Sequence, residues 1–304
     1  QFLGLISGKQ SVNLFVTVLE IVAPVFLLAL IGFTWVKLGF EYRVEFVTRL
    51  AMTLAVPCLI LTALMKTQID PSALSTLLLA SVAAHVAIAA IGALGFWALG
   101  MRQQTYLAPF TFGNTGNLGL PLALFAFGAD GLGYAMVIFA VSAILSFTFG
   151  IWVVSGGGGF TKALKEPMVA ATLLGTLFLW QGWQTPDFLT NTLDLIGQMA
   201  IPLMLITLGV AVARLKPGRI PQAIVLSFVK YVICAGVALA IGLALGLSDV
   251  PLAVLVLQTA TPVAVTAYLL AQKYGADADA VAGLVVVSTL MSVAAIPLLL
   301  AFLL

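Results

Sequence analysis

Long apolar stretches separated by short polar ones run through the whole chain. A helix needs about 20 predominantly apolar residues to cross the ~30 Å hydrocarbon layer of a bilayer. The pattern therefore predicts an all-α integral membrane protein. We expect ten transmembrane helices, over residues 13–35, 46–66, 72–100, 104–127, 131–154, 167–184, 188–213, 220–247, 250–274 and 278–304.

The first half of the sequence recurs in the second half at a nearly constant offset. Residues 55–62 (AVPCLILT) return 145 positions later as residues 200–207 (AIPLMLIT). Residues 128–130 (GAD) return 147 positions later as residues 275–277. In membrane proteins such a repeat is typical of substrate carriers, whose site lies near the bilayer midplane where two related halves meet.

Each half contains five predicted helices, so the two halves have opposite orientations in the membrane. An odd number of crossings forces the second half to enter from the other side, which makes the repeat inverted. We expect one five-helix repeat over residues 1–154 and the other over residues 160–304, with the glycines at 156–159 as the join.

The fourth and ninth predicted helices are interrupted at matching positions of the repeat. Residues 113–121 (GNTGNLGLP) interrupt the fourth and residues 258–266 (QTATPVAVT) interrupt the ninth, so that Asn117 aligns with Pro262. Proline removes an amide donor and clashes with the preceding turn, while glycine weakens a helix. The residues expected to break the helices are Gly119, Pro121 and Pro262.

Two such breaks predict a binding site for an anion. Freed backbone groups cannot face lipid, so the breaks must be buried in protein or line a wet cavity. If inverted symmetry makes them cross, two half-helix amino ends meet near the midplane and favour a carboxylate. The alternative is a pair of packing kinks. The predicted substrate-binding residues are Asn114, Thr115, Gly116, Asn117, Thr261, Pro262, Thr266 and Lys230.

Three ionisable side chains inside predicted helices are candidates for function. A lysine near the midplane costs about 2.5–3.5 kcal/mol, so we expect Lys230 to bind the anion or to act as a built-in cation; the alternative is that it caps backbone carbonyls. His85 occupies the same position in the first repeat. It is a candidate for proton coupling or a side chain satisfied between helices. Glu20 is a second coupling candidate, or it reaches the outer interface.

Charge and composition add an orientation and exclude several functions. With 62% hydrophobic and 8% charged residues the chain does not resemble a soluble protein, and its net charge of +2 gives no reason to expect a nucleic-acid partner. Short cytoplasmic loops are rich in Lys and Arg. The loops after odd-numbered helices are therefore expected to be cytoplasmic, which places both termini outside, in a bacterial inner membrane. These loops carry Lys37, Arg43, Arg102, Lys162, Lys165, Arg214, Lys216, Arg219 and Lys273.

The sequence shows no apparatus for catalysis. It contains one histidine, no two carboxylates that could meet, and no motif for a metal ligand set, a nucleophile or a nucleotide. We therefore expect neither an enzyme nor a cofactor or metal, but a secondary carrier driven by a gradient of Na⁺ or H⁺. A ligand sensor with a carrier fold is the alternative, although sensors usually carry an output domain. A channel explains the repeat less well.

The two interruptions also resemble those of a known family. The runs at residues 114–121 (NTGNLGLP), 258–262 (QTATP) and 272–277 (QKYGAD) look like the auxin efflux carrier family of membrane transport proteins, and the likeness covers nearly the whole chain. Plant auxin exporters show Asn-Pro-Asn-x-Tyr where residues 114–118 read NTGNL. The compact form is more similar to prokaryotic members associated with malonate.

This resemblance implies a ten-helix inverted-repeat carrier that works by an elevator-type alternating access. A scaffold over residues 13–66 and 167–213, often dimerising, would hold a mobile core over residues 72–154 and 220–304. The cargo would be a small organic anion, either a carboxylate such as malonate or an auxin-like acid. The runner-up is a Na⁺-coupled carrier that resembles the bile-acid sodium symporters.

Overall fold

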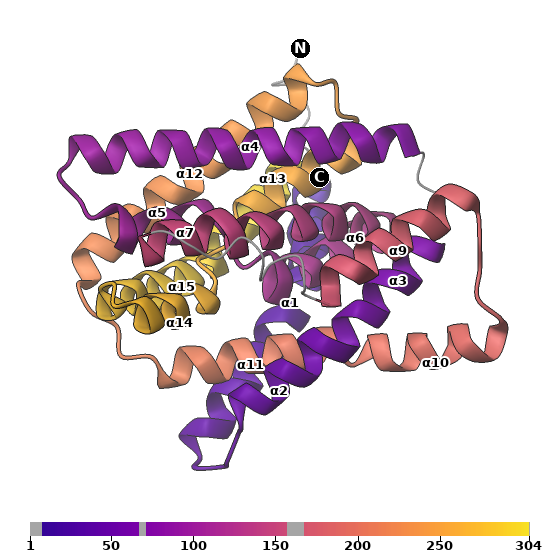
Figure 1. Ribbon diagram of the computed structural model, residues 1–304, viewed down its shortest axis with the longest axis horizontal. Helices are drawn as coiled ribbons and strands as arrows, with labels where there is room; N and C mark the ends of the chain where they lie inside the picture. The colour runs from indigo at the N-terminus through magenta and orange to yellow at the C-terminus, as the bar shows by residue number, and fades with distance from the viewer. Residues whose placement is uncertain (1–7, 67–70, 157–166, 304) are drawn as a thin grey trace.

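The computed structural model describes residues 8–66, 71–156 and 167–303, and all regular elements in these ranges are helices (Figure 1). The expected glycine join therefore lies mostly outside the described residues. Among the described residues, seven helices are long and apolar enough to cross a membrane. An all-α membrane protein is thus confirmed, whereas the count of ten and the inverted repeat stay predictions. The seven are Val18–Lys37, Val44–Met65, Leu74–Ala98, Thr115–Ser155, Asp187–Arg214, Ile220–Ala244 and Ala278–Leu303.

The first three predicted helices appear within a few residues of their expected bounds. The second of them is one continuous helix with a π-helical turn, η1, in its middle. The elements are α1 (Gly8–Lys37), α2 (Val44–Leu50), η1 (Ala51–Ala55), α3 (Val56–Lys66) and α4 (Pro71–Ala98).

The next segment breaks where the sequence predicted and bends once more. The first break, at residues 112–114, is non-helical backbone between α5 and η2. Within α6, Gly128 has a φ of 66°, a left-handed conformation that only glycine adopts without strain. The bend falls between the predicted fourth and fifth helices. The elements are α5 (Gln103–Thr111), η2 (Thr115–Gly119), α6 (Leu120–Leu145), η3 (Ser146–Gly150) and α7 (Ile151–Ser155).

The second half repeats this order of elements. Residues 260–264 separate α13 from α14 and form the second break. At the start of α15, Asp277 Oδ1 accepts a hydrogen bond from Ala280 N at 3.0 Å, so this carboxylate caps a helix. The elements are α9 (Pro167–Gln181), α10 (Asp187–Gln198), α11 (Ala200–Arg214), α12 (Ile220–Ala244), α13 (Asp249–Thr259), α14 (Val265–Tyr274) and α15 (Ala278–Leu303).

Helix packing joins the two halves of the chain. α1 packs against α11, and α3 packs against α9 and α10. At the α1–α11 contact a Cβ on Gly32 or on Gly209 would collide with the backbone carbonyl of Ile206 or Ala29, so both glycines are needed for the close approach of the two backbones. α12 packs against α4, α13 and α15, while α6 packs against α13.

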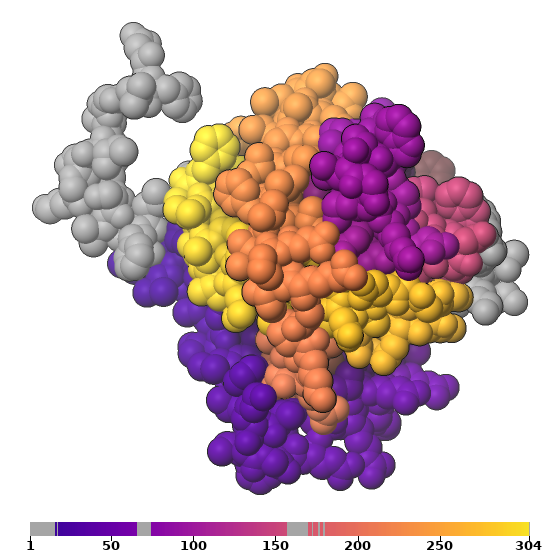
Figure 2. All heavy atoms as spheres, turned by 90° about the vertical axis from the view of Figure 1, so that its left-hand side faces the viewer, coloured from indigo at the N-terminus to yellow at the C-terminus, as the bar shows by residue number. Residues whose placement is uncertain are grey.

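These contacts divide the helices in space. In Figure 1, α4 and α12 lie on one side of the molecule and α2, α10 and α11 on the other, with α5, α6 and α7 between them. In the side view of Figure 2 the indigo residues of the first two helical segments gather below the later helices, which are coloured orange and yellow.

Candidate functional site: a cavity at two crossed breaks

The two breaks lie against each other. Gly113 and Val263 form an antiparallel backbone bridge, and Asn114 N–H donates a hydrogen bond to Pro262 O at 2.7 Å. A Cβ on Gly113 would collide with Thr261, so only glycine allows this approach. The two breaks, which the sequence predicted to meet, are therefore in contact.

Polar groups freed by the breaks find partners inside the protein. Asn114 O accepts hydrogen bonds from Leu118 N at 3.2 Å and Gly119 N at 3.1 Å. Val263 N–H donates to Ser288 Oγ at 2.9 Å. An extended segment inside a membrane protein is tolerated only when its backbone is satisfied in this way, which explains the serine on α15.

A cavity of about 230 Å³ lies beside the crossing. Its walls come from α2, η1, η2, α6, η3, α11 and α14, together with the residues next to each break. Within the described ranges, none of its lining side chains carries a charge. The polar side chains that line it are Thr48, Asn114, Thr115, Asn117, Ser142, Ser146, Thr207 and Thr266.

Two helices begin at this cavity. η2, which continues directly into α6, starts at Thr115, and α14 starts at Val265; both residues line the cavity. The first amides of a helix have no intrahelical acceptor and carry partial positive charge. In addition, Asn114 Nδ2 is buried and has no hydrogen-bond partner among the described residues. The site therefore offers donors without a formal charge.

Much of the remaining wall is apolar. Met52, Phe139, Phe147 and Leu269 line the cavity with apolar side chains. A guest that fits would place an anionic or strongly accepting group at the crossing and a less polar body against these side chains.

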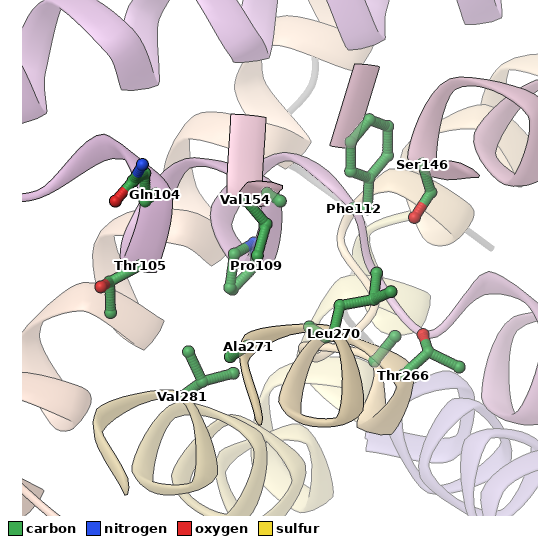
Figure 3. Close-up of a pocket in the computed structure, with 13 residues that line it drawn as sticks. Gln104, Thr105, Pro109, Phe112, Ser146, Val154, Thr266, Leu270, Ala271 and Val281 are labelled. Carbon is green, nitrogen blue, oxygen red and sulfur yellow. The ribbon is translucent and has the colours of Figure 1, made fainter. Parts of the chain in front are cut away.

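A second, much smaller cavity of about 10 Å³ continues from the first (Figure 3). The two share Phe112, Ser146, Ala264 and Thr266. The smaller cavity then follows α5 as far as Gln104, and its volume is about that of one water-sized probe. Phe112 therefore lies where the main cavity narrows.

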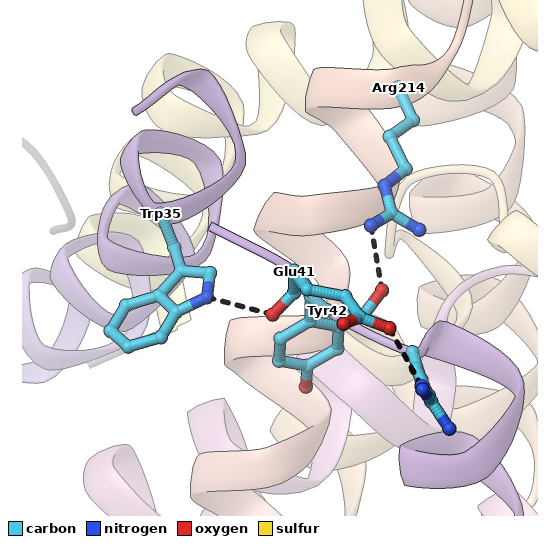
Figure 4. Close-up of polar contacts among 5 residues, drawn as sticks. Trp35, Glu41, Tyr42 and Arg214 are labelled. Carbon is cyan, nitrogen blue, oxygen red and sulfur yellow. Dashed lines mark hydrogen bonds and ion pairs between the residues drawn. The ribbon is translucent and has the colours of Figure 1, made fainter. Parts of the chain in front are cut away.

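The loop between α1 and α2 is tied to the far wall of the cavity (Figure 4). Arg214 Nη2 donates to Tyr42 O at 2.6 Å, and the Tyr42 hydroxyl bonds to Thr207 Oγ1 at 2.8 Å. Burial raises the pKa of Tyr42 above its ordinary value of 10.0, although the hydrogen bond with Thr207 lowers it in part. The phenol is therefore protonated at neutral pH and holds a cavity-lining threonine.

Comparison with known proteins gives the family. The model of a family described as membrane transport protein matches residues 17–159 and 159–300. The chain belongs to this membrane transport protein family. The family resemblance predicted from the two breaks is thus confirmed, and members of this family and their relatives are transporters rather than enzymes.

Two relatives of the membrane transport protein family illustrate the range of similarity. An "Uncharacterized transporter" of Methanothermobacter thermautotrophicus is 28% identical over 297 residues, which cover 92% of this chain and 96% of the relative. A "Putative malonate transporter" of Rhizobium meliloti is 25% identical over 265 residues, which cover 80% of this chain and 82% of the relative.

Within this transport protein the structure brings together most of the predicted binding residues. Five of them line the cavity, whereas Thr261 and Pro262 form the backbone of the second break and do not line it. The five are Asn114, Thr115, Gly116, Asn117 and Thr266.

The predicted ionisable residues lie outside the cavity lining. Lys230 Nζ donates to Phe110 O at 3.0 Å, which matches the expected alternative of a capped carbonyl. His85 Nδ1 bonds to Ser81 O at 2.8 Å, and its ring stacks on Phe112 with centroids 5.9 Å apart. Glu20 is exposed on α1.

Two of the three predicted breakers lie in helical backbone, which is a correction. The first break is at residues 112–114, upstream of Gly119 and Pro121. Gly119 closes the π-helical turn and packs against the Gln258 side chain, while Pro121 lies in the first turn of α6.

Sequence reasoning missed the wall contributed by α2 and α11. Thr48 and Thr207 line the cavity from these helices. Thr207 carried a signal, since it ends the repeated run at residues 200–207, but its partner Tyr42 lies 165 positions away in the sequence. Phe139 and Phe147 lie in an apolar stretch and carried no signal.

Proposed function

We propose that the chain is a secondary carrier that binds a small organic anion at the crossed breaks. The observation that supports this most directly is the unpartnered Nδ2 of Asn114 beside two helix starts in an uncharged cavity. A carboxylate would accept from that amide and from the free N–H groups, and it would interact favourably with both helix dipoles. No cofactor is needed for this binding.

The origin of the cavity walls supports alternating access by an elevator-type movement. One wall, with Thr48 and Thr207, belongs to the proposed scaffold of residues 13–66 and 167–213. The opposite wall, with Asn114 and Thr266, belongs to the proposed core of residues 72–154 and 220–304. A core that slides along the scaffold would carry the anion with it and expose it on the other side.

Ten spans in two inverted repeats are compatible with the seven long helices. Thr115–Ser155 is 41 residues long, about twice what one crossing needs, and it bends at Gly128. Counting it as two spans and adding α9 and the α13–α14 pair gives ten. The packing pairs support the symmetry, because exchanging the halves turns the α1–α11 contact into the contact of α3 with α9.

The proposed orientation makes this an inward-facing state. The cavity lining includes Val44 at the start of α2 and Ala211 in the last turn of α11, next to Arg43 and Arg214, and we propose that the cavity opens toward these residues. With basic loops cytoplasmic, both termini would be outside. Impermeant maleimide should then label Lys216→Cys only from the cytoplasm and Asp249→Cys only from outside; the reverse pattern would refute the orientation.

Transport is tested with purified protein in liposomes. Radiolabelled malonate and phenylacetate are offered separately under an inward Na⁺ gradient, an inward proton gradient, or neither. Saturable uptake of either probe that accelerates with one gradient supports a coupled carrier and identifies the ion. Binding without flux under any condition would refute the carrier in favour of a sensor. Absence of both binding and flux for a carboxylate panel would refute the anion site.

A further inference from the structure

Lys230 is a buried positive charge without a negative partner. Its side chain is 1% exposed and lies near the middle of α12. Among the described residues no aspartate or glutamate is buried, and no ion pair involves Lys230. Its Nζ donates to Phe110 O at 3.0 Å and approaches Cys234 Sγ at 3.8 Å. Neutral acceptors of this kind compensate a buried charge only in part.

The ammonium lies directly behind the crossing. Phe110 is in the last turn of α5, two residues before Phe112, which lines the cavity. A small void of about 10 Å³ beside Lys230 is also lined by Val263, the residue that pairs with Gly113. The crossed backbone thus separates Lys230 from the anion site, and that backbone is thin.

We propose that Lys230 is the counter-charge of the transported anion and acts as a positioning residue through the crossed backbone. This inference rests on the proposed carrier function. The empty core then carries one uncompensated positive charge, and a core loaded with a monovalent anion is neutral. The anion lowers the free-energy cost of burying the ammonium, and the ammonium strengthens anion binding without contacting the anion.

Two consequences concern charge. A monovalent carboxylate balances Lys230, whereas a divalent one leaves an excess negative charge in a cavity that has no charged side chain among the described residues. The site should therefore prefer monocarboxylates over fully ionised dicarboxylates such as malonate. In addition, the loaded core crosses the membrane without net charge, so the membrane potential acts on the return of the empty core.

The first experiment compares a charged probe with its uncharged isostere. Phenylacetate and phenylacetamide are titrated by calorimetry into detergent-solubilised wild type, Lys230→Met, Lys230→Arg and the exposed-site control Lys216→Met. For charges roughly 10 Å apart at an effective dielectric constant of about 20, Lys230→Met should weaken phenylacetate binding by about tenfold. Phenylacetamide binding should stay unchanged. Lys230→Arg and Lys216→Met should resemble the wild type for both probes.

Equal weakening of both probes in Lys230→Met would assign the lysine a packing role and overturn the inference. Unchanged phenylacetate binding would overturn it as well. In either case the proposed anion site would stand, because the wild type still binds the carboxylate, and the carrier function would still be decided by the flux assay. If the wild type binds no carboxylate, the carrier function fails first and the inference fails with it.

A second measurement uses only the wild type and so does not depend on the folding of a variant. Liposomes with equal phenylacetate on both sides exchange labelled for unlabelled anion while valinomycin and K⁺ set the potential. Exchange should not respond to a change of 100 mV, whereas net uptake should. Movement of one net charge would shift the distribution of loaded carriers roughly fifty-fold at that potential. A voltage-dependent exchange rate would overturn the proposed charge balance.

Discussion

Asn114 provides the sharpest test of the site because its backbone amide and its side-chain amide have different roles that can be tested separately. Its backbone amide holds the crossing through Pro262 O, whereas its side-chain Nδ2 has no partner among the described residues. Asn114→Leu keeps the backbone amide and a similar side-chain shape and removes the carboxamide with its unpartnered donor. A buried donor without an acceptor costs about 1–3 kcal/mol, so the empty variant should be as stable as the wild type or more stable.

Anion binding should respond in the opposite direction. A hydrogen bond from Asn114 to a carboxylate contributes about 1.5–3 kcal/mol, so Asn114→Leu should weaken phenylacetate binding by about ten- to a hundred-fold. Asn114→Asp should abolish detectable binding, because two like charges about 4 Å apart repel by about 4 kcal/mol at an effective dielectric constant of 20.

A matched control lies on the other break. Neither amide atom of Gln258 has a hydrogen-bond partner in the described part of the chain, and this residue does not line the cavity. Gln258→Met should therefore preserve both stability and phenylacetate affinity. Thermal unfolding in detergent and calorimetric titration measure the two quantities. An Asn114→Leu protein that binds within twofold of wild type, or that loses stability in parallel with binding, would refute the assignment of Asn114 to the site.

Two further predictions concern the crossing and its far wall. A Cβ at Gly113 would lie 2.9 Å from the Thr261 backbone oxygen, so Gly113→Ala should lower the free energy of unfolding by about 1–3 kcal/mol and impair uptake. Gly116→Ala meets only a movable aromatic ring and should lower it less. The reverse order of melting temperatures would contradict this reasoning. Tyr42→Phe removes the bond to Thr207 and should lower stability by about 1 kcal/mol. Burial raises the folded-state pKa of Tyr42, so the stability difference between wild type and Tyr42→Phe should be present below pH 10 and disappear as the pH rises through that pKa. An unchanged stability difference in strong alkali would exclude the hydrogen bond as its cause.

The sequence predicted where the helices are interrupted better than it predicted which residues contact the interruptions. Gly113 and Pro262 are poor helix residues for reasons that act within one turn, so their effect is visible in the chain itself. Gly119 and Pro121 are also poor helix residues, yet they lie in helical backbone, because the chain is already interrupted a few residues upstream. Local propensity therefore predicts that a break occurs, but not at which of several weak residues it falls.

Contacts between distant segments could not be predicted in this way. The apolar pattern predicted that Lys230 lies near the midplane. The direction in which its side chain points depends on the rotation of α12 relative to α5. The same holds for Tyr42 and Thr207, whose contact exists only because α11 packs beside the loop that follows α1. Rotation about a helix axis is set by tertiary packing, and a helix with apolar residues all round carries little information about it.

The site is asymmetric although its two breaks lie at matching positions of the sequence repeat. His85 and Lys230 occupy the same repeat position, but the imidazole bonds within its own helix while the ammonium reaches across to the first break. Among the described residues, only the first break contributes side-chain amides to the cavity; the second contributes the start of α14. A break in each half is thus enough to place two helix starts at one cavity. The polar side chains that distinguish one ligand from another need to be present on one break alone.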